Sequence, residues 1–200
     1  MFCREFSRSE ASTVGDARPA SDQTADLRRA VLVAYRRVLV LGGARSGKSL
    51  HAERVAMECG EPVLYVATAT ALDEEMAERI REHQQRRPQG WRTLEVPVGV
   101  AAAVAAGLGA ARTVVVEDLT LLLANITDAP EATAIQEVDQ LLAVPANLVL
   151  VSNEVGMGVV PAYPAGRQFR DRLGRLNQHA AARADEVVLL VAGLPLRLKP

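Results

Sequence analysis

The chain lacks three features that would each define a class of protein: abundant cysteine, long apolar runs and a charge excess. Its two cysteines, Cys3 and Cys59, are too few for a disulfide framework or a cysteine-rich metal cluster. No stretch reaches the ~20 apolar residues that a membrane-spanning helix needs. Lys and Arg number 23 against 24 Asp and Glu. This balance argues against a dedicated nucleic-acid-binding protein, which needs a large positive excess.

The remaining composition is that of a folded chain. Hydrophobic residues make up 49% and charged residues 24%, the proportions of an ordinary globular protein. The segment from Met1 to about Arg29 differs, because it is rich in Ser, Ala, Asp and Arg and contains no apolar signal-peptide core. We predict a flexible N-terminal extension over residues 1–36 and a single domain over residues 37–200. Since both thiols are expected to be free, we also predict a cytoplasmic location.

Short apolar runs alternate with helical patterns after this extension. The predicted strands are Arg37–Leu41, Val63–Thr68, Thr113–Glu117, Leu148–Ser152 and Glu186–Val191. The predicted helices are Lys48–Glu58, Leu72–Arg87, Val98–Ala106, Ile135–Leu142 and Arg167–Arg183. Strands that are apolar on both faces suit a parallel sheet covered on two sides. The alternation therefore predicts an α/β fold with a doubly wound, mostly parallel sheet flanked by helices, which binds ligands beyond the carboxyl ends of its strands.

The sharpest local pattern is GGARSGKS, which fits GxxxxGK[ST] between a predicted strand and a predicted helix. We predict that it binds a nucleotide through Gly42, Gly43, Ala44, Arg45, Ser46, Gly47, Lys48 and Ser49. In this interpretation Lys48 reaches the β- and γ-phosphates and Ser49 offers its hydroxyl to Mg²⁺. The pattern places the fold in the P-loop NTPase-like (RecA-like) class. Kinases, ATPases and switches share such loops, so the loop alone does not name a reaction.

Two further positions are candidates for chemistry. Glu117 and Asp118 end a predicted strand, and one of these carboxylates is expected to assist Mg²⁺. His83 follows the apolar positions Leu72, Met76 and Ile80 at the edge of a helical stripe. A neutral imidazole can attack phosphorus, and the arginines that follow can neutralise phosphate charge. From residue chemistry alone, a surface histidine and a nucleophile both stay open, whereas His51 and His179 are expected to be structural or exposed.

Six segments follow one another along the chain: GGARSGKS (42–49), YVATA (65–69), DEEMAERIREHQQRRPQGWRTLEVP (73–97), VEDLTLLLANI (116–126), SNEVGMGVVP (152–161) and FRDRLGRLNQHAAARADEVVLLVAGLPLRLK (169–199). Together, in this order, they resemble the bifunctional adenosylcobinamide kinase/adenosylcobinamide-phosphate guanylyltransferase family of cobalamin biosynthesis. The resemblance covers nearly everything after Arg37 but not the N-terminal extension.

The resemblance implies two reactions. The first phosphorylates adenosylcobinamide with a nucleoside triphosphate, ATP or GTP. The second transfers GMP from GTP to adenosylcobinamide phosphate through a covalent GMP-histidine, and His83 matches the family's histidine. It also implies nucleotide contacts at Ala67, Thr68, Gln84, Gln85, Arg86, Arg87, Glu95 and Glu117. Mg²⁺ would be held by Ser49 and Glu117, and Lys48 and His83 would be the catalytic pair in a single catalytic domain. A homotrimer, with neighbouring chains completing the active site, is expected.

The chain also departs from the family's pattern. Relatives often carry Asp-Cys where this chain has Glu117-Asp118, and some carry a second histidine where it has Glu82. Glu95 suits a guanine edge or a structural salt bridge equally well. The alternatives are a kinase of another small molecule, a guanylyltransferase without kinase activity, and a nucleotide-binding regulatory module without turnover.

Overall fold

The computed structural model describes residues 34–71 and 73–200, without the side chains of Glu75, Met76, Arg79 and Arg86. The predicted extension over residues 1–36 therefore lies almost wholly outside the described residues, as do Cys3 and Leu72, and it stays a prediction. Tyr35–Pro200 form one compact unit.

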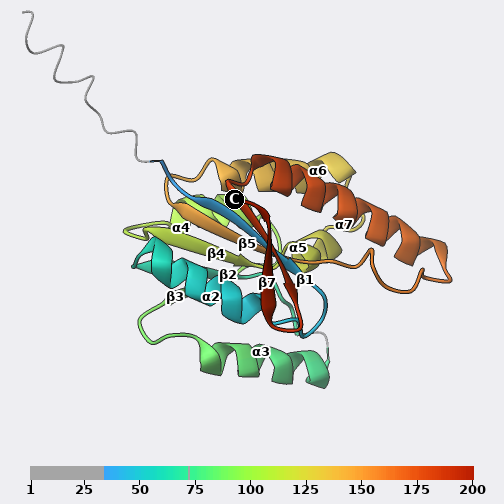
Figure 1. Ribbon diagram of the computed structural model, residues 1–200, viewed down its shortest axis with the longest axis horizontal. Helices are drawn as coiled ribbons and strands as arrows, with labels where there is room; N and C mark the ends of the chain where they lie inside the picture. Colours follow the sequence, from blue (N-terminus) through green and yellow to red (C-terminus); the bar gives the residue numbers. More distant parts are fainter. Residues whose placement is uncertain (1–33, 72) are drawn as a thin grey trace, which may run out of the picture. The chain divides into compact units, whose positions relative to one another are not determined.

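A seven-stranded sheet forms the centre of this unit (Figure 1). The strands are β1 (Arg37–Gly42), β2 (Val63–Ala67), β3 (Arg92–Glu95), β4 (Thr113–Glu117), β5 (Asn147–Asn153), β6 (Glu186–Val191) and β7 (Leu194–Lys199). Their spatial order is β3-β2-β4-β5-β1-β6-β7. All neighbouring pairs are parallel except β6 and β7, which form an antiparallel pair at one edge. The mostly parallel, doubly wound sheet that the sequence predicted is confirmed.

Six helices accompany the strands in the described part of the chain. They are α2 (Lys48–Cys59), α3 (Glu74–Arg86), α4 (Val100–Gly107), α5 (Leu119–Asn125), α6 (Glu131–Leu142) and α7 (Pro164–Arg183). Every predicted strand and helix is present with bounds shifted by a few residues. The prediction missed β3, α5 and β7. No helix within the described residues is long and apolar enough to span a bilayer.

Alternate residues of each strand face opposite sides of the sheet, and each side has its own apolar core. On one side Ala52, Val55 and Ala56 of α2 pack against a cluster that includes Val38 and Tyr65; we call this the α2 core. On the other side α4, α5, α6 and α7 cover the larger cluster. The sheet is therefore closed on both faces, and ligand access is left to its edges and to the carboxyl ends of its strands.

Candidate nucleotide site

The phosphate loop, Gly42–Ser49, connects β1 to α2 and is shaped by two glycines. A Cβ added to Gly42 would lie 2.3 Å from Ser46 Oγ and 3.0 Å from the carbonyl oxygen of Leu190, so no larger residue fits. Gly47 has φ of 94°, in the left-handed region that favours glycine. Lys48 is 6% exposed and its Nζ donates a hydrogen bond to the Gly43 carbonyl at 3.2 Å. The loop therefore turns tightly and holds its lysine against the backbone.

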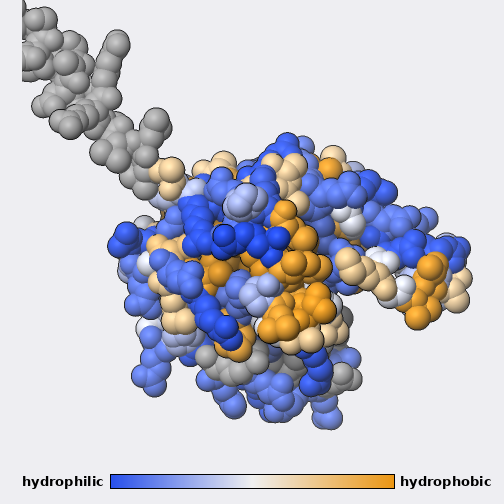
Figure 2. Space-filling model, viewed as in Figure 1, coloured by the Kyte–Doolittle hydropathy of each residue, from blue (hydrophilic) through white to orange (hydrophobic). Residues whose placement is uncertain are grey.

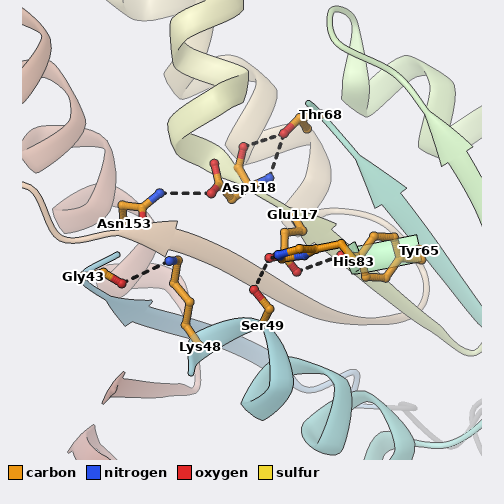
Figure 3. A network of polar contacts seen from close by, with 9 residues as sticks. All are labelled: Gly43, Lys48, Ser49, Tyr65, Thr68, His83, Glu117, Asp118 and Asn153. Carbon is orange, nitrogen blue, oxygen red and sulfur yellow. Dashed lines mark hydrogen bonds and ion pairs between the residues drawn. The ribbon is translucent and has the colours of Figure 1, made fainter. Parts of the chain in front are cut away.

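Glu117 is the acid that faces this loop (Figure 3). It ends β4, and its Oε1 accepts a hydrogen bond from the Ser49 hydroxyl. Its Oε2 accepts one from the Tyr65 hydroxyl at 2.8 Å. Burial raises the pKa of Tyr65 far above its ordinary value, and the Glu117 charge adds to this effect, so the phenol stays protonated as a donor. The carboxylate is thus held between the phosphate loop and β2.

His83 approaches the same carboxylate from α3. Its Nδ1 lies 3.7 Å from Glu117 Oε1, and its side chain is 25% exposed. Figure 3 shows the imidazole beside Glu117, with the Ser49 side chain pointing toward the same carboxylate. The structure therefore brings the loop's metal-binding candidate, the strand-end acid and the histidine of α3 into one place.

Asp118 has a different environment from its neighbour Glu117. Its Oδ1 accepts from the Leu121 backbone N–H at 2.8 Å and caps α5, and its Oδ2 accepts from Asn153 Nδ2 at 3.0 Å. Burial raises the pKa of the Asp118 carboxyl, although the Leu121 hydrogen bond partly opposes this. The Asp118 backbone N–H donates a hydrogen bond to the Thr68 hydroxyl, and that hydroxyl donates one to the Asp118 carbonyl oxygen. Of the two strand-end acids, Glu117 is the one that contacts Ser49.

A cavity of about 560 Å³ opens between the phosphate loop and α3. Ten of the predicted site residues line it: Arg45, Ser46, Gly47, Lys48, Ser49, Ala67, His83, Arg87, Glu95 and Glu117. Its volume lies within the roughly 300–1,000 Å³ of small-molecule sites. The cavity is therefore large enough for a nucleotide and is lined by the residues that the sequence predicted to bind one.

Six other predicted contacts are not among the residues that line this cavity: Gly42, Gly43, Ala44, Thr68, Gln84 and Gln85. Thr68 is fully buried and engaged with Asp118, and Gln84 donates to Glu95 Oε1 at 2.9 Å. Gln85 is exposed on α3, and the Arg86 side chain lies outside the described atoms. Their roles stay predictions, as does the guanine-binding role of Glu95, which already has Gln84 as a partner.

Sequence reasoning missed Tyr65, which lines the cavity from β2. The guanidinium carbon of Arg87 lies 4.1 Å from the centroid of the Tyr65 ring, and the Tyr65 hydroxyl donates a hydrogen bond to Glu117. The tyrosine begins the segment YVATA, but it sits in an apolar run that predicts a buried strand, so nothing in the sequence gave its side chain a role in the site.

Ser49 and Glu117 carry oxygen atoms of the kind that Mg²⁺ prefers as ligands. Within the described ranges, no group of three or more His, Cys, Asp and Glu side chains converges as a self-sufficient metal centre. Mg²⁺ is commonly bound by one or two protein ligands together with substrate phosphates and water. The residues present fit that arrangement.

A glycine-rich loop at a strand–helix junction, facing an acid at the end of another strand, defines a P-loop NTPase-like nucleotide-binding protein. The profile of the family described as cobinamide kinase / cobinamide phosphate guanyltransferase, CobU, matches residues 38–198. The chain therefore belongs to the CobU family.

Curated relatives agree with this assignment. The bifunctional adenosylcobalamin biosynthesis protein CobP of Pseudomonas aeruginosa is 46% identical over 168 residues, which cover 82% of this chain and 97% of that protein. The corresponding CobU proteins of Escherichia coli and Salmonella typhimurium are each 41% identical over 180 residues, covering 81% of this chain and 99% of theirs.

A solved structure, the VirB11 ATPase of the Brucella suis type IV secretion system, has a TM-score of 0.44 and 15% identity. The match covers 90% of this chain and 53% of the VirB11 chain, and the likeness is distant. Membership of the CobU family confirms the predicted enzyme class, a cobinamide kinase and cobinamide-phosphate guanyltransferase.

Proposed function

We propose that this chain phosphorylates adenosylcobinamide and then transfers GMP from GTP to adenosylcobinamide phosphate through a covalent adduct on His83. One observation carries the covalent step: His83 lines the same cavity as Lys48 and Ser49, with its Nδ1 3.7 Å from Glu117 Oε1. A single triphosphate site then serves both reactions.

In the kinase step the phosphate loop binds the triphosphate of ATP or GTP. Its backbone N–H groups and the N-terminus of α2 face the phosphates, and Lys48 leaves the Gly43 carbonyl to neutralise charge that develops on the transferred phosphoryl group. Ser49 and Glu117 would hold Mg²⁺, which would supply neutralisation of the phosphate charge. The acceptor is the hydroxyl of adenosylcobinamide.

In the guanylyl step the neutral His83 ring attacks the α-phosphorus of GTP. A bond forms from Nε2 to phosphorus, the bond to the bridging oxygen breaks, and pyrophosphate leaves. The ring becomes positively charged while it keeps the proton on Nδ1, and the Glu117 carboxylate faces that nitrogen. An oxygen of adenosylcobinamide phosphate then attacks the same phosphorus, and the nitrogen–phosphorus bond breaks to restore neutral imidazole.

Assembly and location belong to the proposal too. We propose a homotrimer in the cytoplasm, in which neighbouring chains complete the site. Its support is the resemblance and an exposed apolar segment between β5 and α7 (Figure 2), where Met157, Val159 and Tyr163 are 78%, 94% and 67% exposed. Sedimentation equilibrium measures the number of chains, and a monomer would contradict this part of the proposal.

Intact-mass analysis after incubation with GTP tests the covalent step. We expect the wild-type chain to gain the mass of one GMP, in a bond that is labile to acid and stable to base. His83→Gln should lose the adduct but still phosphorylate adenosylcobinamide. His51→Gln is the matched control and should keep both activities, because His51 lies on α2 outside the cavity lining.

The same experiment separates the alternatives. An unchanged adduct in His83→Gln would refute the assignment of the nucleophile. An adduct without phosphorylation of adenosylcobinamide would leave a guanylyltransferase alone. Phosphorylation without any adduct would leave a kinase, and the absence of both would leave a regulatory nucleotide-binding module.

A further inference from the structure

We propose that Tyr65 is a positioning residue that orients both Glu117 and Arg87 in the nucleotide site. The part of this inference that concerns His83 rests on the function proposed above. The part that concerns Ser49 rests on the proposed Mg²⁺ site alone and not on the covalent step. None of the motifs that identify the site assigns Tyr65 a role.

The position of Tyr65 in the sheet explains how a core residue reaches the site. Tyr65 belongs to the α2 core and is 1% exposed. On the neighbouring strand Glu117 pairs with Ala67, two residues beyond Tyr65 on the same face of the sheet. Diagonal neighbours of this kind lie within reach of long and aromatic side chains. Because residue 67 is only an alanine, the Glu117 side chain has room to lean back to the Tyr65 hydroxyl, which donates to Oε2 at 2.8 Å.

This hydrogen bond gives the two carboxylate oxygens different partners. Oε2 is occupied by Tyr65, whereas Oε1 faces the Ser49 hydroxyl and His83 Nδ1. The terminal torsion of a glutamate is broad and nearly two-fold, so an unrestrained carboxylate turns easily. The Tyr65 hydroxyl therefore fixes the carboxylate plane in the orientation that serves the loop and the histidine together.

The ring of Tyr65 supports a second group. The Arg87 guanidinium lies over it at 4.1 Å from the centroid, within the range of a cation–π contact. Arg87 also donates to Thr93 Oγ1 at 3.3 Å. It lies four residues after His83, directly beyond the end of α3. Arg87 therefore connects the end of α3 to the sheet. The same contact with the Tyr65 ring keeps the positive charge of Arg87 at the wall of the cavity.

Tyr65→Phe isolates the hydroxyl, because the ring and its contact with Arg87 remain. We expect two changes of about 10–100-fold, the usual effect of removing a group that orients a metal ligand. The Mg²⁺ concentration that half-saturates binding of an α,β-methylene GTP analogue, which cannot release GMP, should rise. The single-turnover rate of His83 guanylylation should fall. Affinity for the analogue at saturating Mg²⁺ should stay within about twofold.

Trp91→Phe is the matched control. Trp91 lies 6.3 Å from Tyr65 between ring centroids, and its Nε1 donates to Glu61 rather than to a site residue. It should leave both measurements within about twofold of wild type. If Tyr65 only fills the core, Tyr65→Phe will also leave them unchanged, and the inference is then overturned.

Tyr65→Leu removes the ring as well and tests the Arg87 contact. We expect it to weaken binding of the analogue at saturating Mg²⁺, which Tyr65→Phe does not. Equal affinities in these two variants, both shown to be folded by near-ultraviolet circular dichroism, would overturn the role of the ring. If the wild-type chain forms no GMP adduct, the proposed nucleophile fails, but the Mg²⁺ titration still decides the role of the hydroxyl.

Discussion

Helices α2 and α3 both border the cavity, yet they are attached to the sheet in different ways. Three residues of α2 lie in the α2 core, and its first residues belong to the phosphate loop. Among the described side chains, α3 contributes none to either core. Figure 1 shows α3 along the bottom of the view, beyond α2 and apart from the other helices. Its described links to the sheet near the cavity are polar ones through His83, Gln84 and, just past its end, Arg87.

The two sides of the site are therefore held in place in different ways. Regions with few buried apolar contacts open at lower free energy than packed core elements. The phosphate loop is therefore held by the global stability of the domain, whereas the position of His83 depends on local contacts. Changes near α2 should affect all nucleotide binding, and changes in α3 should affect guanylyl transfer more than stability.

The largest expected effect comes from the phosphate loop. Lys48→Met removes the point charge that serves both reactions, and we expect both rates to fall by roughly 10²–10³-fold, as when one preorganised donor is removed. Steady-state assays of phosphorylation and a mass measurement of the GMP adduct check the prediction.

The chain offers a matched control, because Lys199 is its other lysine. Its Nζ donates to carbonyls at the end of α7, among them Ala181 and Ala182 at 3.3 and 3.2 Å. Lys199→Met should lower the free energy of unfolding by about 1 kcal/mol and leave both rates unchanged. If Lys48→Met lowered only one of the two rates, the idea of one shared triphosphate site would be wrong.

A pair of truncations tests the contrast in packing directly. Leu39 in β1 is completely buried, and Leu39→Ala should lower the free energy of unfolding by about 2–5 kcal/mol. Ile80 in α3 lines the cavity and is only half-buried, so Ile80→Ala should cost under about 1 kcal/mol. Urea denaturation followed by circular dichroism measures both. Similar losses for the two variants would show that α3 is as firmly packed as the core.

The same contrast explains what the sequence could predict. The phosphate loop is made of consecutive residues with strong backbone requirements at Gly42 and Gly47, so one short pattern predicts its place and its neighbours. Strands buried on both faces give continuous apolar runs, which is why the five central ones were predicted. The strand β3 has four half-exposed or exposed residues, and β7 carries Pro195 at an edge, so neither has that pattern.

Long-range geometry accounts for the rest. Successive side chains at the end of β4 point to opposite sides of the sheet, so only one of Glu117 and Asp118 can face the loop. Asp118 instead caps α5, a helix that was not predicted. The role of Tyr65 depends on the register between β2 and β4, which a single sequence does not specify.

The smallest expected effect concerns His51, the histidine of the well-anchored helix. Burial lowers its pKa, and the nearby Arg54 adds to this effect. The unfolded chain therefore binds more protons than the folded one once the pH falls below about 6.5, and stability should decrease from there towards the lowered pKa of the folded state. His51→Gln removes this titration, so the loss of unfolding free energy between pH 7.5 and 5.5 should shrink by roughly a few tenths of a kcal/mol, because the side chain is only partly buried. Urea titrations at the two pH values measure the difference. If the variant lost more unfolding free energy between these pH values than the wild type, the folded chain would favour the charged form of His51. The direction of the pKa shift would then be wrong.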